Sequence, residues 1–214
     1  MSVFNASRLQ NKTVLNCPDD HQCCGKFGKD VPQELRDVDI LVNNAGSCLA
    51  WKELERSRTR ISSLCTYRRM YSHRPETNGS SGYPDFKKRQ TGHFINIGSV
   101  AGREPYVGGS IYCATKHAVS AFTGSLMREL VDTPIRVTEI QPGMVETDFS
   151  VTRYRGDKSA ADKVYTAFSL VIVAEDIAEE IVWAAARPPH VNLAQVYVLP
   201  VNQASATLSY RKPQ

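Results

Sequence analysis

The sequence predicts an α/β fold built on a doubly wound parallel sheet that is incomplete in its N-terminal half. Short, almost continuously apolar runs, typical of strands buried in a parallel sheet, alternate with longer segments that have a helical period. Strands and helices that alternate in this way form parallel sheets covered by helices on both faces. The 214 residues, 42% of them apolar, suffice for one domain with a core, so a single domain is expected over residues 1–214.

The expected strands are short runs closed by turn residues. Lys12-Thr13-Val14-Leu15 is the first, and residues 39–44 (DILVNN) form an apolar run closed by Ala45-Gly46. The same pattern recurs at residues 93–99, at residues 135–140, which Gln141-Pro142-Gly143 stops, and at residues 195–199.

Two segments are expected to be helices. Residues 112–131 carry apolar side chains spaced by four along one face. Residues 174–186 are rich in Ala, Glu and Ile and end before Pro188-Pro189. With the strands, these helices predict a Rossmann-like sheet that is incomplete in its N-terminal half. The apolar face of the first helix is expected to hold Ala114, Ala118, Phe122, Leu126 and Leu130.

The charge and the cysteine content exclude few classes of protein. The net charge of +4 comes from residues 47–83, which hold seven Lys or Arg and three Asp or Glu. A bias this small does not by itself indicate a nucleic-acid partner, and no apolar run is long enough to span a membrane. A cytoplasmic location is expected, in which the six cysteines are thiols.

Tyr112 and Lys116 (YCATK) are four apart on the first expected helix and therefore share a face. A fixed cation favours the phenolate and lowers the pKa of the tyrosine from about 10, so that Tyr112 can exchange a proton with a substrate oxygen. Taken alone, such a pair is more often a packed ring beside a solvated ammonium.

Other polar groups follow the expected strands. Ser99 closes one strand, Asn43-Asn44-Ala45-Gly46 closes another, and residues 142–147 (PGMVET) close a third. In an open α/β sheet, ligands bind beyond the carboxyl ends of the strands, so these groups are expected at one edge. Each has a structural alternative: Asn43 and Gly46 as a turn, Ser99 as a helix cap, and Pro142-Gly143 as a strand stop.

NNAG at 43–46, GSVAG at 98–102, YCATK at 112–116 and PGMVET at 142–147, in this order, resemble the short-chain dehydrogenase/reductase family. The similarity covers residues 31–46 and 86–214. RYRGD at 153–157 and PVNQA at 200–204 further resemble the NADP-dependent serine and 3-hydroxy acid dehydrogenases.

The resemblance implies an NAD(P)-dependent enzyme that interconverts hydroxyl and carbonyl on a small 3-hydroxy acid such as serine. It implies NADP as the cofactor, with NAD possible, no metal, a small-molecule substrate and a homotetramer. Arg153 or Arg155 is a candidate for a substrate carboxylate, an exposed or interface arginine being the alternative. The implied catalytic residues are Ser99, Tyr112 and Lys116, and the implied cofactor-binding residues are Asn43, Ala45, Gly46, Tyr112, Lys116, Pro142, Gly143, Val145 and Thr147.

Residues 16–30 and 47–83 depart from the family pattern. The family has TGxxxGxG after its first strand, where glycines let backbone N–H groups reach the pyrophosphate, whereas this chain has only Gly25-Lys26-Phe27-Gly28. The family also has an apolar helix with a catalytic asparagine where residues 47–83 lie, and no asparagine precedes Asn78 there. The alternatives to an active enzyme are therefore an inactive relative and a misread gene product.

Two other interpretations of these stretches are weak. Cys17, His21, Cys23 and Cys24 include adjacent ligands and lack a second spaced pair, which is poor for zinc. The arginines between residues 56 and 74 could meet nucleic acid, but no nucleic-acid-binding fold accompanies them.

Overall fold

The computed structural model describes residues 6–17, 37–44, 86–147, 150–151, 157–166 and 170–211. Its centre is a five-stranded sheet in which every neighbouring pair is parallel. The α/β fold expected from the sequence is therefore confirmed. In spatial order the strands are β1 (Val14–Cys17), β2 (Ile40–Asn43), β3 (His93–Ile97), β4 (Arg136–Pro142) and β7 (Gln195–Val198).

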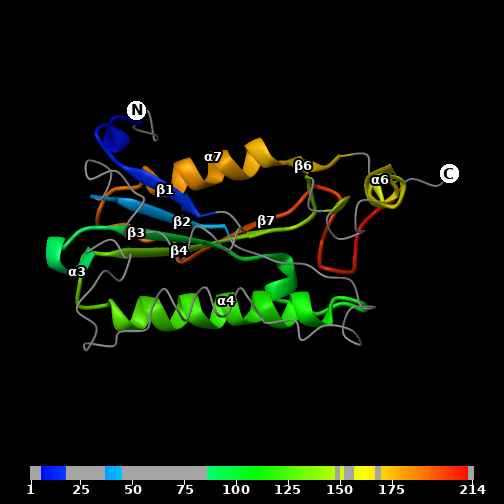
Figure 1. Ribbon diagram of the computed structural model, residues 1–214, viewed down its shortest axis with the longest axis horizontal. Coiled ribbons are helices and arrows are strands. Elements are labelled where there is room, and N and C mark those ends of the chain that lie inside the picture. Colours follow the sequence, from blue (N-terminus) through cyan, green and yellow to red (C-terminus); the bar gives the residue numbers. More distant parts are fainter. Residues whose placement is uncertain are drawn as a thin grey trace.

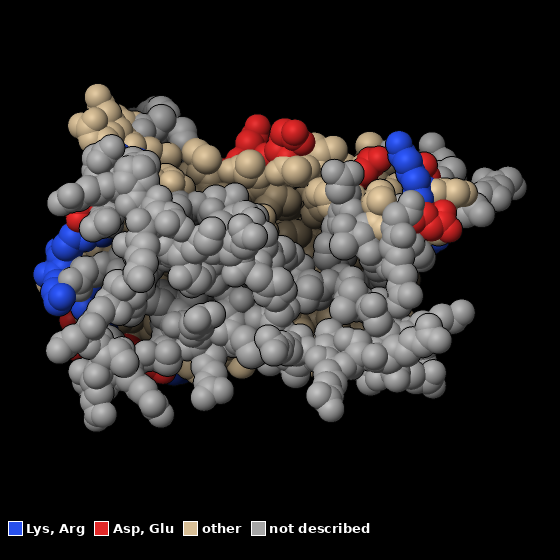
Figure 2. Space-filling model, in the orientation of Figure 1, with Lys and Arg blue, Asp and Glu red and all other residues tan. Residues whose placement is uncertain are grey.

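Helices cover both faces of the sheet (Figure 1). The longest, α4 (Ser110–Glu129), lies along one face, and α7 (Ala174–Ala185) lies along the other. The α7 helix buries Ile177, Ala184 and Ala185. Figure 2 shows Asp and Glu side chains gathered on the solvent side of this helix. The remaining elements are η1 (Ala6–Leu9), α3 (Phe86–Arg89), η4 (Val100–Gly102) and α6 (Lys158–Thr166), with a small second sheet of β5 (Val145–Glu146) and β6 (Ile172–Val173).

The strands lie where the apolar runs predict them, with small differences at their ends. The expected stop at Gln141-Pro142 is wrong, because β4 continues through both residues. The ladder with β3 ends at Ile140, and beyond it β4 pairs only with β7. Pro142 therefore removes no N–H from the ladder with β3, and proline is tolerated where a strand has a single neighbour.

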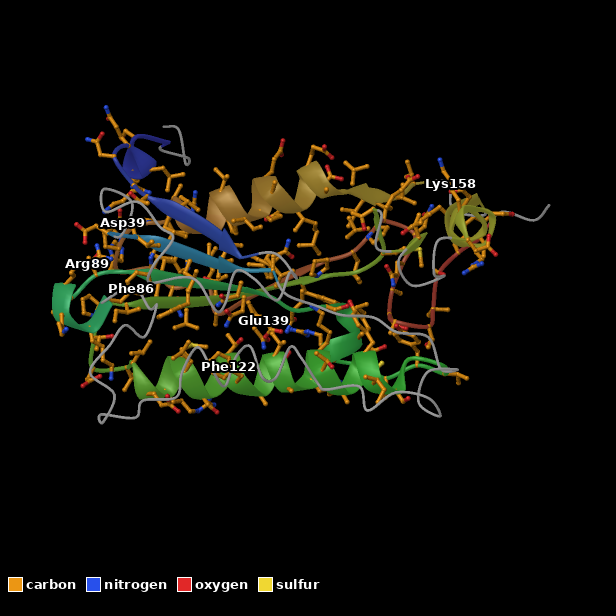
Figure 3. All side chains as sticks on the ribbon, viewed as in Figure 1. Asp39, Phe86, Arg89, Phe122, Glu139 and Lys158 are labelled. Carbon is orange, nitrogen blue, oxygen red and sulfur yellow. The ribbon has the colours of Figure 1, made fainter. Side chains whose placement is uncertain are left out.

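Asp39 fastens β1 to the strand beside it. Its carboxylate accepts a hydrogen bond from the backbone N–H of Thr13 (3.0 Å) and pairs with the Lys12 ammonium (3.0 Å). The Arg89 guanidinium approaches the same carboxylate at 4.0 Å (Figure 3). The described sheet ends at β1. The departures expected at 16–30 lie outside the described residues from position 18 onward, and those at 47–83 lie wholly outside them.

The expected apolar face of α4 is only partly correct. Leu126 and Leu130 are buried, but Ala118 and Phe122 are half-buried and Ala114 is exposed. A spacing of four residues drifts by about 40° per step around a helix with 3.6 residues per turn, so the far end of the row leaves the sheet. The residues that α4 buries are Cys113, Thr115, Lys116, Val119, Thr123 and Leu126.

The two faces of the sheet differ in polarity. Side chains alternate along a strand, so odd and even positions face different helices. Toward α7, Ile40, Val42, Ile95, Ile97 and Ile140 form one apolar cluster with Ile177 and Ala184. Toward α4, Leu41, Phe94 and Val137 pack with Leu126 and Leu130. Further along the strands, this second face becomes polar, with buried Asn43, Asn96, Glu139 and Gln141.

Candidate active site

The predicted site residues lie around the carboxyl ends of the parallel strands. Asn43 is the last residue of β2, Ser99 follows β3, and Gly143 follows β4. Tyr112 and Lys116 lie in the first turns of α4, the helix that begins at this edge. Ala45 and Gly46, and the candidate substrate-binding Arg153 and Arg155, lie outside the described residues.

Ser99 is buried and lies at the start of η4. Its Oγ accepts a hydrogen bond from the backbone N–H of Ala101 (3.1 Å), so the helix-cap alternative is what the structure adopts. A hydroxyl has two acceptor positions and one donor, and this cap occupies a single acceptor position. The cap therefore fixes the side chain without using its O–H as a donor.

Lys116 is buried rather than solvated, which excludes the commonest alternative for a Tyr-x-x-x-Lys pair. Only 5% of the residue is exposed. Its ammonium donates to the carbonyl of Ile97, two residues before Ser99, at 3.0 Å. The same ammonium lies 5.8 Å from the centroid of the half-buried Tyr112 ring. Burying an ammonium costs free energy unless it is paired, so the Ile97 carbonyl supports a cation beside the tyrosine.

A chain of buried hydrogen bonds runs beneath these residues. The Asn43 Nδ2 donates to Asn96 Oδ1 (2.7 Å), and the Asn96 Nδ2 donates to Thr123 Oγ1 (2.9 Å). The Thr123 hydroxyl in turn donates to the Val119 carbonyl (2.8 Å). Sequence reasoning missed Asn96 and Thr123. The available signal was a polar residue inside the apolar run HFINI and a threonine seven residues after Lys116.

Glu139 is a fully buried carboxylate between β4 and α4 (Figure 3). Its Oε1 accepts a hydrogen bond from Ser120 Oγ (2.6 Å), and its Oε2 has no partner among the described residues. A Cβ at Gly98 would lie 2.2 Å from Oε1, so only glycine leaves room for this carboxylate beside the strand that leads to Ser99.

The C-terminal tail holds the turn after β4. Gln203, which is buried, accepts a hydrogen bond through its Oε1 from the backbone N–H of Met144 (2.8 Å). The backbone N–H of Gly143 donates to Val198 (2.7 Å), and the Val145 carbonyl accepts from the Tyr165 hydroxyl (3.0 Å). The PVNQA segment therefore contacts the turn after β4 through Gln203. Sequence reasoning did not identify this contact.

A separate cavity of about 410 Å³ lies between η4, α4 and the β7 edge. The Arg103 guanidinium lies in it, 4.6 Å from the centroid of the Tyr197 ring, and donates to Gln141 (2.5 Å) and Gln195 (2.9 Å). Burial and the Glu104 carboxylate raise the pKa of Tyr197, and Arg103 partly opposes this. The lining includes none of the predicted catalytic residues.

Asn43, at the end of β2, indicates what kind of ligand could bind at this edge of the sheet. Its Oδ1 is buried and lacks a hydrogen-bond partner in the described part of the chain. Lys116 supplies a cationic donor nearby in the fold, and hydroxyl-rich sugars offer the donors and acceptors that such groups bind. The hydroxyls of a ribose, as a dinucleotide carries, fit these groups.

No helix in the described ranges is both long and apolar enough to cross a membrane. Within the same ranges, no group of three or more His, Cys, Asp or Glu side chains could hold a metal ion.

Comparisons with known proteins show the family of the chain. The family model described as short chain dehydrogenase matches residues 15–158. The NADP-dependent 3-hydroxy acid dehydrogenase of Schizosaccharomyces pombe is 40% identical over 184 residues, which cover 86% of this chain and 70% of that protein. The serine 3-dehydrogenase of Agrobacterium fabrum is 36% identical over 181 residues, covering 82% and 69%.

Among solved structures, the closed form of serine dehydrogenase complexed with NADP+ superposes with a TM-score of 0.72 at 33% identity. The match covers 91% of this chain and 78% of that one. With a family model that spans most of the chain, these likenesses establish the family. The chain belongs to the short-chain dehydrogenase/reductase family of oxidoreductases.

Proposed function

We propose that this chain is an NADP-dependent oxidoreductase that interconverts the hydroxyl and carbonyl groups of a small 3-hydroxy acid such as serine. The names of its relatives support the cofactor and the substrate class. The observation that carries the proposal is the buried Lys116, which lies four residues after Tyr112 on α4. Its ammonium is held by the carbonyl of Ile97, two residues before Ser99.

In the direction of oxidation, the substrate loses a hydride from carbon and a proton from oxygen. The nicotinamide supplies the hydride acceptor. Tyr112 takes the proton through its phenolate oxygen, and it returns the proton when the reaction runs toward the alcohol. Ser99 donates its O–H to the same substrate oxygen, and the Lys116 cation favours the phenolate.

The cofactor would contact residues from three strands and α4. Lys116 would bind the ribose hydroxyls, Asn43 would border the nucleoside, and Val145 and Thr147 would hold the carboxamide. Pro142 and Gly143 would form the adjoining wall, and Ala45 and Gly46, outside the described residues, would continue it on the β2 side.

A second candidate is a dehydrogenase relative that does not bind a cofactor. The sequence after β1 favours it, since Pro18-Asp19-Asp20 stands where the family has TGxxxGxG. Without those glycines, fewer backbone N–H groups can approach the pyrophosphate, and two carboxylates oppose its charge. Weaker NADPH binding than in a serine dehydrogenase relative is therefore expected.

The two candidates are separated by measuring binding and turnover on one preparation. NADPH fluorescence is titrated with the purified protein, and NADP reduction is followed with L-serine and with 3-hydroxypropanoate. Turnover that requires a 3-hydroxy acid supports the dehydrogenase, even at a high KM for NADP. Absence of both binding and turnover, while a related serine dehydrogenase is active in the same assay, supports the second candidate.

A further inference from the structure

Three side chains on one face of α4 form hydrogen bonds with the sheet. Lys116, Ser120 and Thr123 are spaced by four and three residues, which places them in one row. Lys116 donates to Ile97 of β3 (3.0 Å), and Ser120 donates to Glu139 of β4 (2.6 Å). Thr123 accepts from Asn96 of β3 (2.9 Å), the residue that precedes Ile97. The stretch of α4 from Lys116 to Thr123 is thus joined to two strands by directed bonds.

The last turn of the same helix and the residue that caps it are held differently. Leu126 and Leu130 pack against Leu41, Phe94 and Val137, and these contacts are apolar. Apolar contact has no preferred direction, so it specifies the axial position of a helix less sharply than hydrogen bonds do. Hydrogen bonds to oxygen have donor–acceptor distances of about 2.7–3.2 Å, whereas one residue of helix rises about 1.5 Å. A shift of α4 by one residue would therefore break all three bonds of the row.

The direction of the Asn96–Thr123 bond is fixed from β2. The Asn43 amide donates to Asn96 Oδ1, which turns the Asn96 Nδ2 toward Thr123. Thr123 then has its hydroxyl hydrogen left to donate to the Val119 carbonyl. At most 2% of Asn43, Asn96 or Thr123 is exposed, so water does not compete for these bonds. One chain of donors thus connects two strands and the helix that carries Tyr112.

We propose that Asn96 and Thr123 are positioning residues, whose hydrogen bond holds α4 against β3 and so keeps Tyr112 and Lys116 in place relative to Ser99. Neither residue touches the substrate. Displacement of a reacting group by about 1 Å can cost on the order of 100-fold in rate. Only this kinetic consequence of the inference rests on the proposed function.

The test compares Thr123→Val with Thr138→Val. Both threonines are fully or almost fully buried, and both substitutions replace a hydroxyl by a methyl group of similar size. Thr138 Oγ1 bonds the His93 ring (2.7 Å) between β3 and β4, so its loss also leaves a buried polar partner but does not release α4. We expect both variants to lower the melting temperature by similar amounts.

Only Thr123→Val is expected to change the chemistry. Its kcat should fall by about 10- to 100-fold, with KM values for NADP and the hydroxy acid within about twofold of wild type. The acidic limb of its kcat–pH profile should move to higher pH, because Lys116 no longer lies in its place beside Tyr112. Thr123→Ser, which keeps the hydroxyl, should restore kcat and the profile. If Thr123→Val fails to fold, Thr123→Ala is compared in the same way.

A measurement without turnover separates this inference from the proposed function. The phenol of Tyr112 is titrated by NMR in protein with labelled tyrosine, and Tyr112→Phe assigns its signal. A rise in the pKa of Tyr112 in Thr123→Val but not in Thr138→Val supports the positioning role, even in a chain that turns over no 3-hydroxy acid. Equal pKa values in the two variants, or equal losses of kcat, would overturn it.

Discussion

The two faces of the sheet keep their buried polar groups at opposite ends. Toward α7, the polar residues lie at the amino ends of the strands. Arg136 donates to the carbonyls of Ala184 (3.2 Å), Ala185 (2.9 Å) and Arg187 (3.4 Å), and His93 bonds Thr138. Toward α4, they lie at the carboxyl ends, beneath Lys116. The amino-end groups are remote from the predicted site and secure the end of α7, where a cation also meets the negative end of the helix dipole.

Because of this difference, we expect substitutions on the two faces to have different effects, on stability for one face and on reaction rate for the other. The α7 face is apolar beyond the amino ends of its strands, and substitutions in its apolar cluster should change the free energy of unfolding. The α4 face gives up apolar area at its carboxyl end for hydrogen bonds, and its substitutions there should change rate. The predictions below test this difference, except that Gly98→Ala tests the packing at the polar end of the α4 face.

Tyr112→Phe should abolish most of any turnover while leaving the fold intact. General acid–base catalysis contributes about 10²–10⁴-fold, so kcat should fall by at least that factor. The half-buried ring remains, and the melting temperature should change little. Steady-state kinetics and thermal unfolding measure the two effects. A variant that keeps most of its turnover would show that the proton passes through another group.

Ile95→Ala should have the opposite signature. Ile95 is fully buried in the cluster that packs against α7. Truncating a buried isoleucine costs about 2–5 kcal/mol of unfolding free energy, through lost burial and the cavity left behind. Urea unfolding measures the loss, and kcat per folded molecule should remain near wild type. A fall in kcat well below the folded fraction would contradict the division between the faces.

Gly98→Ala should test how tightly the polar end of the α4 face is packed. The added methyl group would meet Glu139 Oε1 at 2.2 Å, and overpacking of this kind costs about 1–3 kcal/mol. In a Glu139→Ala background, the same substitution should cost much less, because the carboxylate it strikes is gone. Chemical unfolding of the two single variants and the double variant gives the coupling. If the losses of unfolding free energy in the two single variants simply add in the double variant, the methyl group at position 98 does not clash with Glu139.

His93 should make stability depend on pH from the α7 face. Burial, and then the Arg136 charge, lower the pKa of His93 well below its ordinary 6.5. Just below pH 6.5, His93 therefore binds a proton in the unfolded chain but stays neutral in the folded chain. Stability should be complete above about pH 6.5 and fall by up to about 1.4 kcal/mol per pH unit below it. His93→Gln should flatten this slope, whereas substitution of the exposed His190 should not. An unchanged slope in His93→Gln would assign it to other groups.

The strands, and the shared helix of Tyr112 and Lys116, could be predicted from the sequence for a physical reason. Buried parallel strands are mostly apolar, and the spacing of Tyr112 and Lys116 is local to one helix. The buried face of α4 could not be found in this way, because Lys116 and Thr123 occupy positions that an apolar pattern assigns to hydrophobic residues. Their partners are distant in sequence: Thr123 bonds a residue 27 positions away, and Gln203 bonds one 59 positions away.

Cys113 lies beside Tyr112 in sequence and is 3% exposed on the buried side of α4. A thiol reacts with an alkylating reagent only when the reagent can reach it, so in the folded chain this cysteine should react only during local opening. The rate of alkylation of its peptide, resolved from the other five cysteines by mass spectrometry, therefore reports how often the first turns of α4 leave the sheet. The protein carries a natural reporter of this motion next to its candidate catalytic tyrosine.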